Sequence, residues 1–284
     1  MIQINNLFNN PNVRIVEKAG PFAILEHQND LSNEPWFAQQ AYFMQKMNLK
    51  KRQVICYLNG GAVKIQAGAM QWTAGNIEIT SGVKSATNFL GNLVKGALTG
   101  ESAVKPVYRG NGYLMLEPTY RYLLCEKAEN WAGGMVIDDG LFLAAEESVG
   151  ERIVSRSNVS SAILGGEGLF NLCLTGAGSV VLESPVPRDE LIELDVQNDV
   201  VKIDGNMAIA WSAGLEFSVE KAGKTWIGSG LSGEGFVNVY RGTGKILMAA
   251  TMTNTVHPDS HGAKQTAADS SHGMLGSIKN SLEL

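Results

Sequence analysis

The side chains in this sequence that could best do chemistry are three glutamates, each of which directly follows a glycine. They are Glu101, Glu167 and Glu234, and they recur at almost equal intervals along the chain. A carboxylate delivered three times to equivalent positions could form an acidic site or hold a cation through its oxygen atoms. Alternatively, each carboxylate accepts hydrogen bonds from backbone N–H groups of the neighbouring turn and stabilises the chain before the next strand. We favour the second interpretation, because an active site rarely needs the same acid three times.

Histidine is nearly absent from the part of the chain that carries these glutamates. His27 precedes it, His257, His261 and His272 follow it, and none lies between residues 54 and 252. A metal-dependent cupin needs two or more histidines on adjacent strands, and a Ser-His-Asp or Cys-His arrangement needs a histidine base. We therefore expect a protein that is not an enzyme, with no metal site and no cofactor.

The charge of this 284-residue chain is slightly acidic and evenly spread. Its 28 acidic residues outnumber its 23 lysines and arginines, for a net charge of −5. A nucleic-acid surface needs a basic stripe that neutralises phosphates, so we expect no nucleic-acid partner. The densest basic run, Lys50 to Arg52, falls at a segment boundary and is interpreted as the solvated end of a helix.

The cysteine content favours an intracellular protein. Cys56, Cys125 and Cys173 form no C-x-x-C pair, and Cys173 lies in the apolar segment 172–174. Reduced buried thiols behave as small hydrophobic side chains, so we expect Cys173 inside the fold and the protein in the cytoplasm. The chain shows no export-signal pattern at its start and no run of about eighteen apolar residues, so we expect neither secretion nor a membrane span.

The elements that must position the three glutamates repeat with them. Shortly after each glutamate, a Gly-x-Gly turn leads into a short apolar strand, and these turns begin at Gly110, Gly176 and Gly242. Near-equal spacing of one local pattern is typical of a supersecondary unit used repeatedly. The sequence therefore predicts an all-β domain built from three related repeats over residues 53–252.

Each repeat is expected to contain a β-hairpin ahead of its glutamate. Asn59-Gly60, Asp139-Gly140 and Asp204-Gly205 each follow one apolar segment and precede another. Asn-Gly and Asp-Gly are favoured in type I′ turns because both central residues of such a turn have positive φ. We therefore predict a tight hairpin at each of the three sites.

Residues 1–52 lie outside the repeats and are expected to form an N-terminal arm. Residues 13–25 have strand character with a break at Gly20-Pro21, and Ser32 can cap a following helix that has Pro35 in its first turn. Apolar side chains recur in this helix at helical spacing, which indicates a face docked on the β domain. They are Trp36, Phe37, Phe43, Met44 and Met47.

The tryptophans are scattered along the chain rather than gathered in one segment. Trp211 ends the apolar segment 208–211, which is typical of a strand that points inward. Packing in the core or at its ends is expected for all five, rather than a platform on which bases or sugars stack. They are Trp36, Trp72, Trp131, Trp211 and Trp226.

A second helix is expected inside the first repeat, over residues 87–99. Its apolar side chains form a narrow stripe at helical spacing, and those that could contact a partner are Phe89, Leu90, Leu93 and Val94. The stripe either plugs one end of the β domain, which we favour, or contacts a membrane surface or a partner subunit. Residues 253–284 are polar and small, and are expected to form a flexible tail.

Several motifs, in order, resemble the bacterial branch of the altered-inheritance-of-mitochondria (mitochondrial biogenesis) family. The resemblance covers about residues 53–252. The motifs are Gly68-Ala-Met70, Gly75-Asn-Ile-Glu78, Leu98-Thr-Gly-Glu-Ser102, Gly110-x-Gly112-Tyr-Leu-Met-Leu-Glu-Pro118, Asp138-Asp-Gly-Leu-Phe-Leu-Ala144, Leu164-Gly-Gly-Glu-Gly-Leu-Phe170, Gly233-Glu-Gly-Phe236 and Gly242-x-Gly244.

The resemblance implies a β-sandwich of the double-stranded β-helix type, similar in fold to the tryptophan RNA-binding attenuator, with one or two short peripheral helices. Family members usually assemble as oligomers. The eukaryotic relatives are linked to the organisation of the mitochondrial inner membrane, and the bacterial ones are functionally uncharacterised. No catalytic residue is established for the family, so the resemblance supplies none, and the attenuator's RNA binding does not follow from a shared fold.

These observations together predict a non-enzymatic, oligomeric binding or scaffold protein of the cytoplasm. Its expected partners are further copies of itself, and a protein or a membrane surface contacted through residues 87–99. The alternative is a small-ligand-binding or hydrolytic β-barrel that uses the repeated carboxylates Glu101, Glu167 and Glu234.

Overall fold

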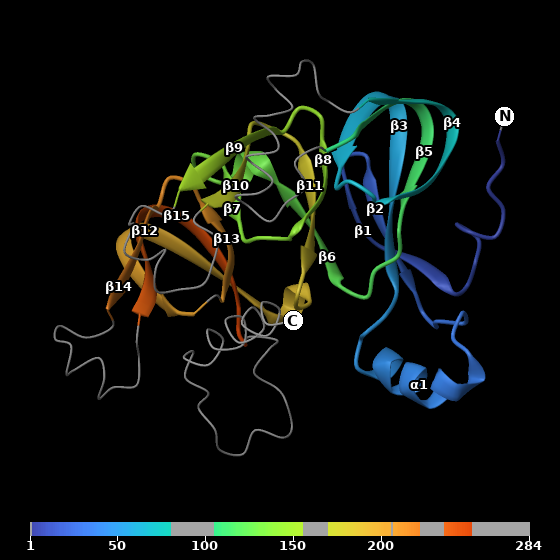
Figure 1. The fold of residues 1–284 in the computed structure, drawn as a ribbon, viewed down its shortest axis with the longest axis horizontal. Coiled ribbons are helices and arrows are strands. Elements are labelled where there is room, and N and C mark those ends of the chain that lie inside the picture. The colour runs from blue at the N-terminus through green and yellow to red at the C-terminus, as the bar shows by residue number, and fades with distance from the viewer. Residues whose placement is uncertain (1, 81–104, 156–169, 206, 222–235, 252–284) are drawn as a thin grey trace, which may run out of the picture. The chain divides into compact units, whose positions relative to one another are not determined.

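The computed structural model describes residues 2–80, 105–155, 170–205, 207–221 and 236–251 (Figure 1). These residues belong to one compact unit, Met1–Met252. The described part is predominantly β, as predicted, and contains one α-helix, α1 (Ala38–Lys46). Three short 3-10 helices accompany it, namely η1 (Pro35–Phe37), η2 (Ala128–Asn130) and η3 (Arg188–Glu190). None of the described helices has the length and apolar content needed to cross a lipid bilayer.

The first antiparallel sheet has eight strands, most of them from the N-terminal half of the chain. Its main path runs β1-β2-β3-β8-β11-β6, and β5 pairs with both β3 and β4. Figure 1 shows β3, β4 and β5 side by side in a strongly curled arrangement. The strands are β1 (Val13–Ala19), β2 (Phe22–His27), β3 (Arg52–Ile65), β4 (Met70–Thr80), β5 (Val107–Leu116), β6 (Tyr122–Lys127), β8 (Phe142–Glu146) and β11 (Ser179–Ser184).

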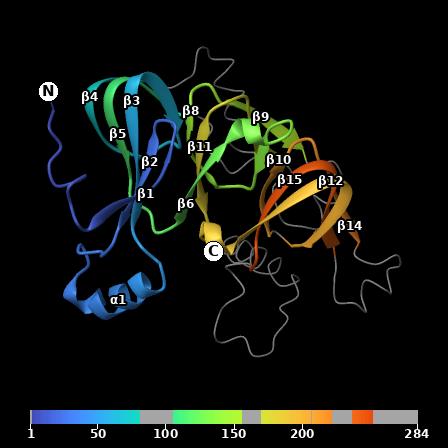
Figure 2. The same cartoon turned by 180° about the vertical axis from the view of Figure 1, so that it is seen from behind.

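The second antiparallel sheet has seven strands. Its path runs β12-β15-β13-β7-β10-β9. β14 pairs with the first half of β15, and β13 pairs with its second half. Figure 2 shows the long strands β12 and β15 side by side from the reverse direction. The strands are β7 (Met135–Ile137), β9 (Gly150–Ser155), β10 (Phe170–Thr175), β12 (Leu191–Asp204), β13 (Ala208–Ser212), β14 (Glu216–Lys221) and β15 (Phe236–Ala249).

Buried side chains of the described residues form two clusters within the first sheet, one within the second, and a fourth shared by both. Leu114 and Val181 belong to the larger cluster of the first sheet, and Tyr240 belongs to that of the second. The shared cluster joins Phe142 of β8 to Ile137 of β7. Fully burying an aliphatic or aromatic side chain contributes about 1.5–3 kcal/mol. The shared cluster therefore couples the two sheets.

The predicted Gly-x-Gly turns are wrong in two of the three copies. β5 runs without interruption through Gly110 and Gly112, and β15 runs through Gly242. Gly112 pairs with Gly75 of β4, and a Cβ atom on Gly112 would lie 2.0 Å from the carbonyl oxygen of Ala74. These strand glycines therefore permit close backbone approach. Only the copy at Gly176 separates two strands, β10 and β11, which belong to different sheets.

The predicted hairpins are also wrong. Asn59-Gly60 lies inside β3, at an irregularity in its pairing with β5. Asp139-Gly140 forms a turn, but the strands on either side of it, β7 and β8, belong to different sheets. Asp204 ends β12 and Gly205 follows it, and the strands β12 and β13 both pair with β15 and not with each other. The glycine φ is positive in all three pairs, whereas the preceding Asn or Asp φ is not, so none is a type I′ turn.

The N-terminal segment follows part of its prediction. The strand-like residues form β1 and β2, with the predicted break at Gly20, whose φ is 53°. Pro35 lies in the first turn of η1, but the residue before that helix is Glu34, and Ser32 instead donates its hydroxyl to Asp30. Ser32 is therefore not the cap. The predicted docking of the aromatic stripe is wrong as well, because the described helix has no buried residue.

Four of the five tryptophans can be placed. Trp131 and Trp211 are buried, as expected for core packing, and Trp72 is half-buried. Trp36 is exposed, which contradicts the expectation. Trp226 lies outside the described residues.

Candidate functional site

The predicted site residues lie in segments outside the described part of the chain. The repeated acids Glu101, Glu167 and Glu234 fall in residues 81–104, 156–169 and 222–235, and so remain predictions. The same holds for the proposed contact residues of the insertion and for the tail over residues 253–284. The contact residues are Phe89, Leu90, Leu93 and Val94.

Two other glutamates accept hydrogen bonds from the backbone of the Gly-x-Gly turn at Gly176. This is the role that the sequence suggested for the repeated acids. The Gly178 N–H donates to Oε2 of Glu129 at 2.9 Å, and the Ser179 N–H donates to Oε1 of Glu146 at 2.7 Å. The hydrogen bond from Gly178 lowers the pKa of Glu129. Glu129 and Gly178 are 49 residues apart, so no local motif signals this contact.

A pocket of about 430 Å³ opens in the second sheet. Strands β7, β9, β10, β13 and β14 contribute to its lining. Its apolar wall comes from Val154, Trp211 and Phe217, and its polar groups come from Arg152, Asn171 and Glu216. A concave site with apolar walls and a few polar groups is the usual form of a small-molecule site.

Three aromatic rings make one wall of this pocket rigid. Trp211 and Phe217 stack with their centroids 5.7 Å apart and their planes at 23°. Tyr240, which is fully buried, packs against both rings at centroid distances of 5.6 and 5.2 Å. Trp211 is buried in β13, as its sequence pattern predicted, although the strand ends one residue later, at Ser212. The buried ring of Tyr240 therefore restrains both stacked rings.

The polar groups of the pocket lie on β9, β10 and the start of β14. Arg152 pairs with Cys173 across β9 and β10, and its guanidinium donates to the carbonyl oxygen of Gly133 at 3.2 Å. The buried Asn171 donates its side-chain amide to the carbonyl oxygen of Ile137 at 3.2 Å. Burial raises the pKa of Cys173, and the charge of Arg152 opposes that rise.

The chemistry of the pocket is suited to binding. An arginine beside a stacked aromatic pair can hold a carboxylate or phosphate while the rings contact a flat apolar group. Among the described lining residues, Glu216 is the only carboxylate, and none is a histidine, cysteine, serine or lysine. Across the described ranges, no group of three His, Cys, Asp or Glu side chains could hold a metal ion.

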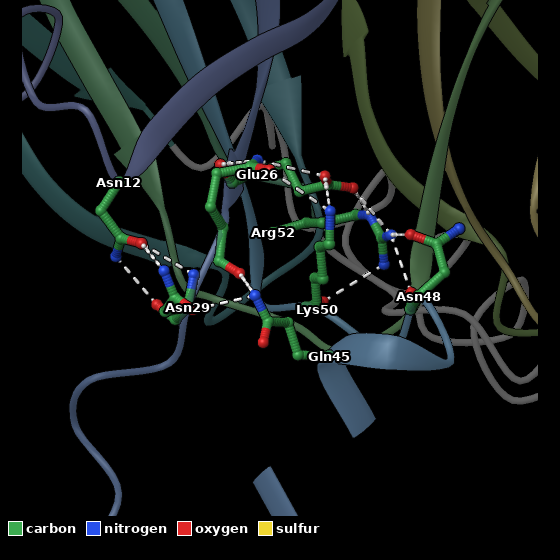
Figure 3. Close-up of polar contacts among 8 residues, drawn as sticks. Asn12, Glu26, Asn29, Gln45, Asn48, Lys50 and Arg52 are labelled. Atoms are coloured by element: carbon green, nitrogen blue, oxygen red, sulfur yellow. Dashed lines mark hydrogen bonds and ion pairs between the residues drawn. The ribbon is translucent and has the colours of Figure 1, made fainter. Parts of the chain in front are cut away.

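A second polar cluster attaches α1 to the first sheet (Figure 3). Gln45 of α1 donates to the carbonyl oxygen of Gln28 at 2.7 Å and to Oδ1 of Asn29 at 2.8 Å. Asn29 is held in turn by Asn12, whose Oδ1 accepts the Asn29 N–H at 2.7 Å. The helix therefore contacts the loop after β2 through a polar side chain.

The basic run after α1 belongs to the same cluster, so its interpretation as a solvated helix end is wrong. Arg52 is 4% exposed and donates twice to Oε2 of Glu26, at 2.9 and 3.1 Å. Lys50 contacts the other oxygen of Glu26, and Lys51 pairs with Asp30, each at 2.9 Å. Burial acts to raise the pKa of Glu26, but the hydrogen bonds and charges of Lys50 and Arg52 outweigh it, and the pKa is lowered.

Comparison with known proteins places this fold in a family. The model of the mitochondrial biogenesis AIM24 family matches residues 44–251. An uncharacterized protein of Streptococcus pyogenes serotype M6 is 27% identical over 201 residues, which cover 67% of this chain and 77% of that protein. A crystal structure of a Streptococcus pyogenes protein is 23% identical, covers 71% of this chain and 88% of its own, and shares the fold with a TM-score of 0.50. The resemblance noted in the sequence is thus confirmed, and the chain belongs to the mitochondrial biogenesis AIM24 family.

Proposed function

We propose that this chain is a non-enzymatic binding protein whose ligand occupies the pocket beside Trp211 and Phe217. The observation that carries the proposal is that Arg152 and the stacked rings of Trp211 and Phe217 line the same pocket. The ligand class that fits is a small organic anion with a flat apolar body and one carboxylate or phosphate group. The pocket volume of about 430 Å³ suits a molecule of this size.

The two parts of the pocket favour the same ligand for different reasons. An aromatic body gains from leaving water and from stacking on a ring that is already ordered, so little conformational entropy is lost on binding. The guanidinium of Arg152 favours an anion, with a planar donor geometry that matches a carboxylate. Asn171 is buried with its amide oriented by Ile137, which favours one orientation of a polar ligand group.

The proposal retains the finer expectations from the sequence. We propose three related β units arranged as a double-stranded β-helix of the attenuator type. The antiparallel pairs β4–β5, β9–β10 and β14–β15 support this arrangement, because in each expected unit the strand before the repeated glutamate pairs with the strand after it. We also propose a cytoplasmic homo-oligomer that acts without nucleic acid or cofactor. Contact with a membrane or protein partner through residues 87–99 belongs to the same proposal.

A matched pair of probes tests the pocket. Isothermal titration with 1-naphthaleneacetate, and with its uncharged amide, measures the contribution of the anion. For the acetate, Arg152→Gln should raise the Kd roughly tenfold, since one charge-assisted contact is lost. The same change should leave the Kd of the amide nearly unchanged, and Arg109→Gln, on the exposed face of β5, should leave both unchanged.

The outcome that contradicts the proposal is also defined by these probes. If neither compound shifts the NMR signals of the Trp211 or Phe217 side chains at millimolar concentration, the pocket is not a site for this ligand class. Equal weakening of acetate and amide by Arg152→Gln would assign Arg152 a structural role alone.

A further inference from the structure

The helix α1 exposes its aromatic side chains to solvent and contacts the loop after β2 through the polar Gln45. Trp36, Phe43 and Met47 are spaced seven and four residues apart, which places them on one face across η1 and α1. Their exposed fractions are 83%, 58% and 72%. The partly buried residues of α1 are Ala41, Met44 and Gln45, and Ala41 and Gln45 lie on the side opposite Phe43. An isolated amphipathic helix on a protein surface normally has the reverse orientation.

Polar contacts hold the helix in this orientation. Gln45 makes two hydrogen bonds to the loop after β2, at 2.7 and 2.8 Å (Figure 3). Just after the helix, Asn48 accepts two hydrogen bonds from the buried Arg52, each at 3.1 Å. Gln45 lies on the side of the helix away from Phe43. The exposure of the aromatic side chains is therefore a consequence of how the helix is attached.

The exposed apolar area is close to what a protein interface needs. We define the α1 apolar face as Trp36, Phe37, Tyr42, Phe43 and Met47, whose exposed fractions run from 52% to 83%. Since an aromatic side chain can bury 150–250 Å², the four aromatic residues alone expose roughly 500 Å². Monomers rarely leave a larger apolar patch uncovered, and a standard interface buries about 800 Å² per partner. Met47 and the nearby Leu31, which is 79% exposed, extend the area towards that value.

The charge around this face selects its occupant. Residues 31–49 contain one acid, Glu34, and one base, Lys46, and the Lys46 ammonium lies 5.2 Å from the ring centroid of Tyr42. The neighbouring Lys50 and Lys51 are in ion pairs with Glu26 and Asp30. A strongly acidic or anionic partner therefore finds no matching basic patch. Two copies of a neutral apolar face can meet around a two-fold axis without repulsion.

From this orientation, area and charge we infer that the α1 apolar face is a dimer interface between two copies of this chain. Aromatic residues and methionine are the side chains enriched at the centres of such interfaces, which agrees with the composition of the face. Most of the face precedes residue 44, where the match to the family begins, so it lies largely outside the part of the chain that the family model matches. The inference rests on the proposed homo-oligomer and not on the proposed ligand pocket at Trp211, so the dimer and the pocket can be tested separately.

Sedimentation velocity of the full chain tests this interface. The wild-type protein should sediment as a dimer with a Kd in the micromolar range or below, as expected for roughly 500–800 Å² per partner. The double variant Phe43→Gln with Met47→Gln should raise the dissociation constant of the dimer at least tenfold. Its far-UV circular dichroism should match that of the wild type, because both residues are exposed in the monomer. The control Ile79→Gln with Val200→Gln changes two exposed apolar residues on β4 and β12, and should keep the dimer.

Each other outcome overturns the inference. The face does not join two copies if the wild-type protein stays monomeric at 100 times the concentration needed for detection. The same holds if the dimer survives the Phe43 and Met47 changes. Binding of the protein to phosphatidylcholine vesicles is measured as well. Binding of a monomer to them that depends on Phe43 and Met47 would assign the face to a lipid surface in place of a second copy.

Discussion

The guanidinium of Arg52 is enclosed between the carboxylate of Glu26 and the ring of Tyr122. Its Nη2 lies 2.9 Å from Oε2 of Glu26, and its central carbon lies 4.5 Å from the ring centroid. Glu26 is on β2, Arg52 begins β3 and Tyr122 begins β6, so one cation links three strands of the first sheet. The same cation also contacts Asn48 just beyond α1, which joins the helix to those strands.

Replacing Glu26 with glutamine should destabilise the fold. Glu26→Gln leaves the buried cation of Arg52 without its counter-charge, and breaking one side of a buried ion pair costs about 3 kcal/mol. Chemical denaturation monitored by tryptophan fluorescence measures this loss. The control Glu193→Gln removes the partner of Lys245 at an exposed site and should cost less than about 1 kcal/mol. Equal costs at the two sites would show that Arg52 is satisfied without Glu26.

The ion pair of Asp30 predicts a specific dependence of stability on pH. Burial opposes the charge of Asp30, but hydrogen bonds from Ser32 and Lys51 outweigh it, and the pKa falls to about 2 from a model-peptide value of 3.8. A carboxyl with a lowered folded pKa stabilises the fold fully above its unfolded pKa, and this contribution is lost as the pH falls through the folded pKa. The difference in unfolding free energy between wild type and Asp30→Asn should therefore be constant above about pH 5 and shrink between about pH 4 and pH 2. A difference that stays constant down to pH 2 would contradict the lowered pKa.

Local patterns predicted the strand content and the burial of individual residues. The break between β1 and β2 follows from Gly20-Pro21, because this pair interrupts an extended segment. Cys173 and Trp211 are buried, as their apolar neighbours indicated. The hairpins could not be predicted in the same way. Asp139-Gly140 correctly marks a turn, but only distant strands decide that β7 pairs with β10 while β8 pairs with β11.

The orientation of α1 and the pocket depend on contacts that no local pattern contains. Helical spacing shows that Trp36 and Phe43 share a face, but it does not show which way that face points. Gln45, whose hydrogen bonds set the orientation, has no distinguishing sequence signal. The pocket is hidden for a similar reason, because Arg152 and Trp211 come from separate strands and meet only in the folded sheet.

The pairing of Gly75 with Gly112 predicts a severe effect of a single methyl group. Gly112→Ala would place a Cβ atom 2.0 Å from the backbone oxygen of Ala74, at a φ of 149°, so β4 and β5 must separate locally. We expect a loss of at least about 3 kcal/mol, as for other disruptive core changes. The matched control is Gly140→Ala, which has a positive φ of 74° but open space, and should cost only about 1–2 kcal/mol. Thermal unfolding of the two variants measures the contrast, and similar midpoints would exclude close approach as the reason for Gly112.

The cysteines provide a test of the packing of both sheets in one experiment. Cys56 and Cys125 lie in the first sheet and Cys173 in the second, and all three are free and buried. Burial raises the pKa of each thiol, that of Cys125 to about 12, so almost no thiolate is present at neutral pH. A disulfide reagent such as dithionitrobenzoate should therefore modify none of the three in the native protein and all three in denaturant. Mass spectrometry after brief labelling identifies any residue that reacts. Rapid native labelling of Cys173 would show that β10 opens to solvent, and would contradict its place inside the second sheet.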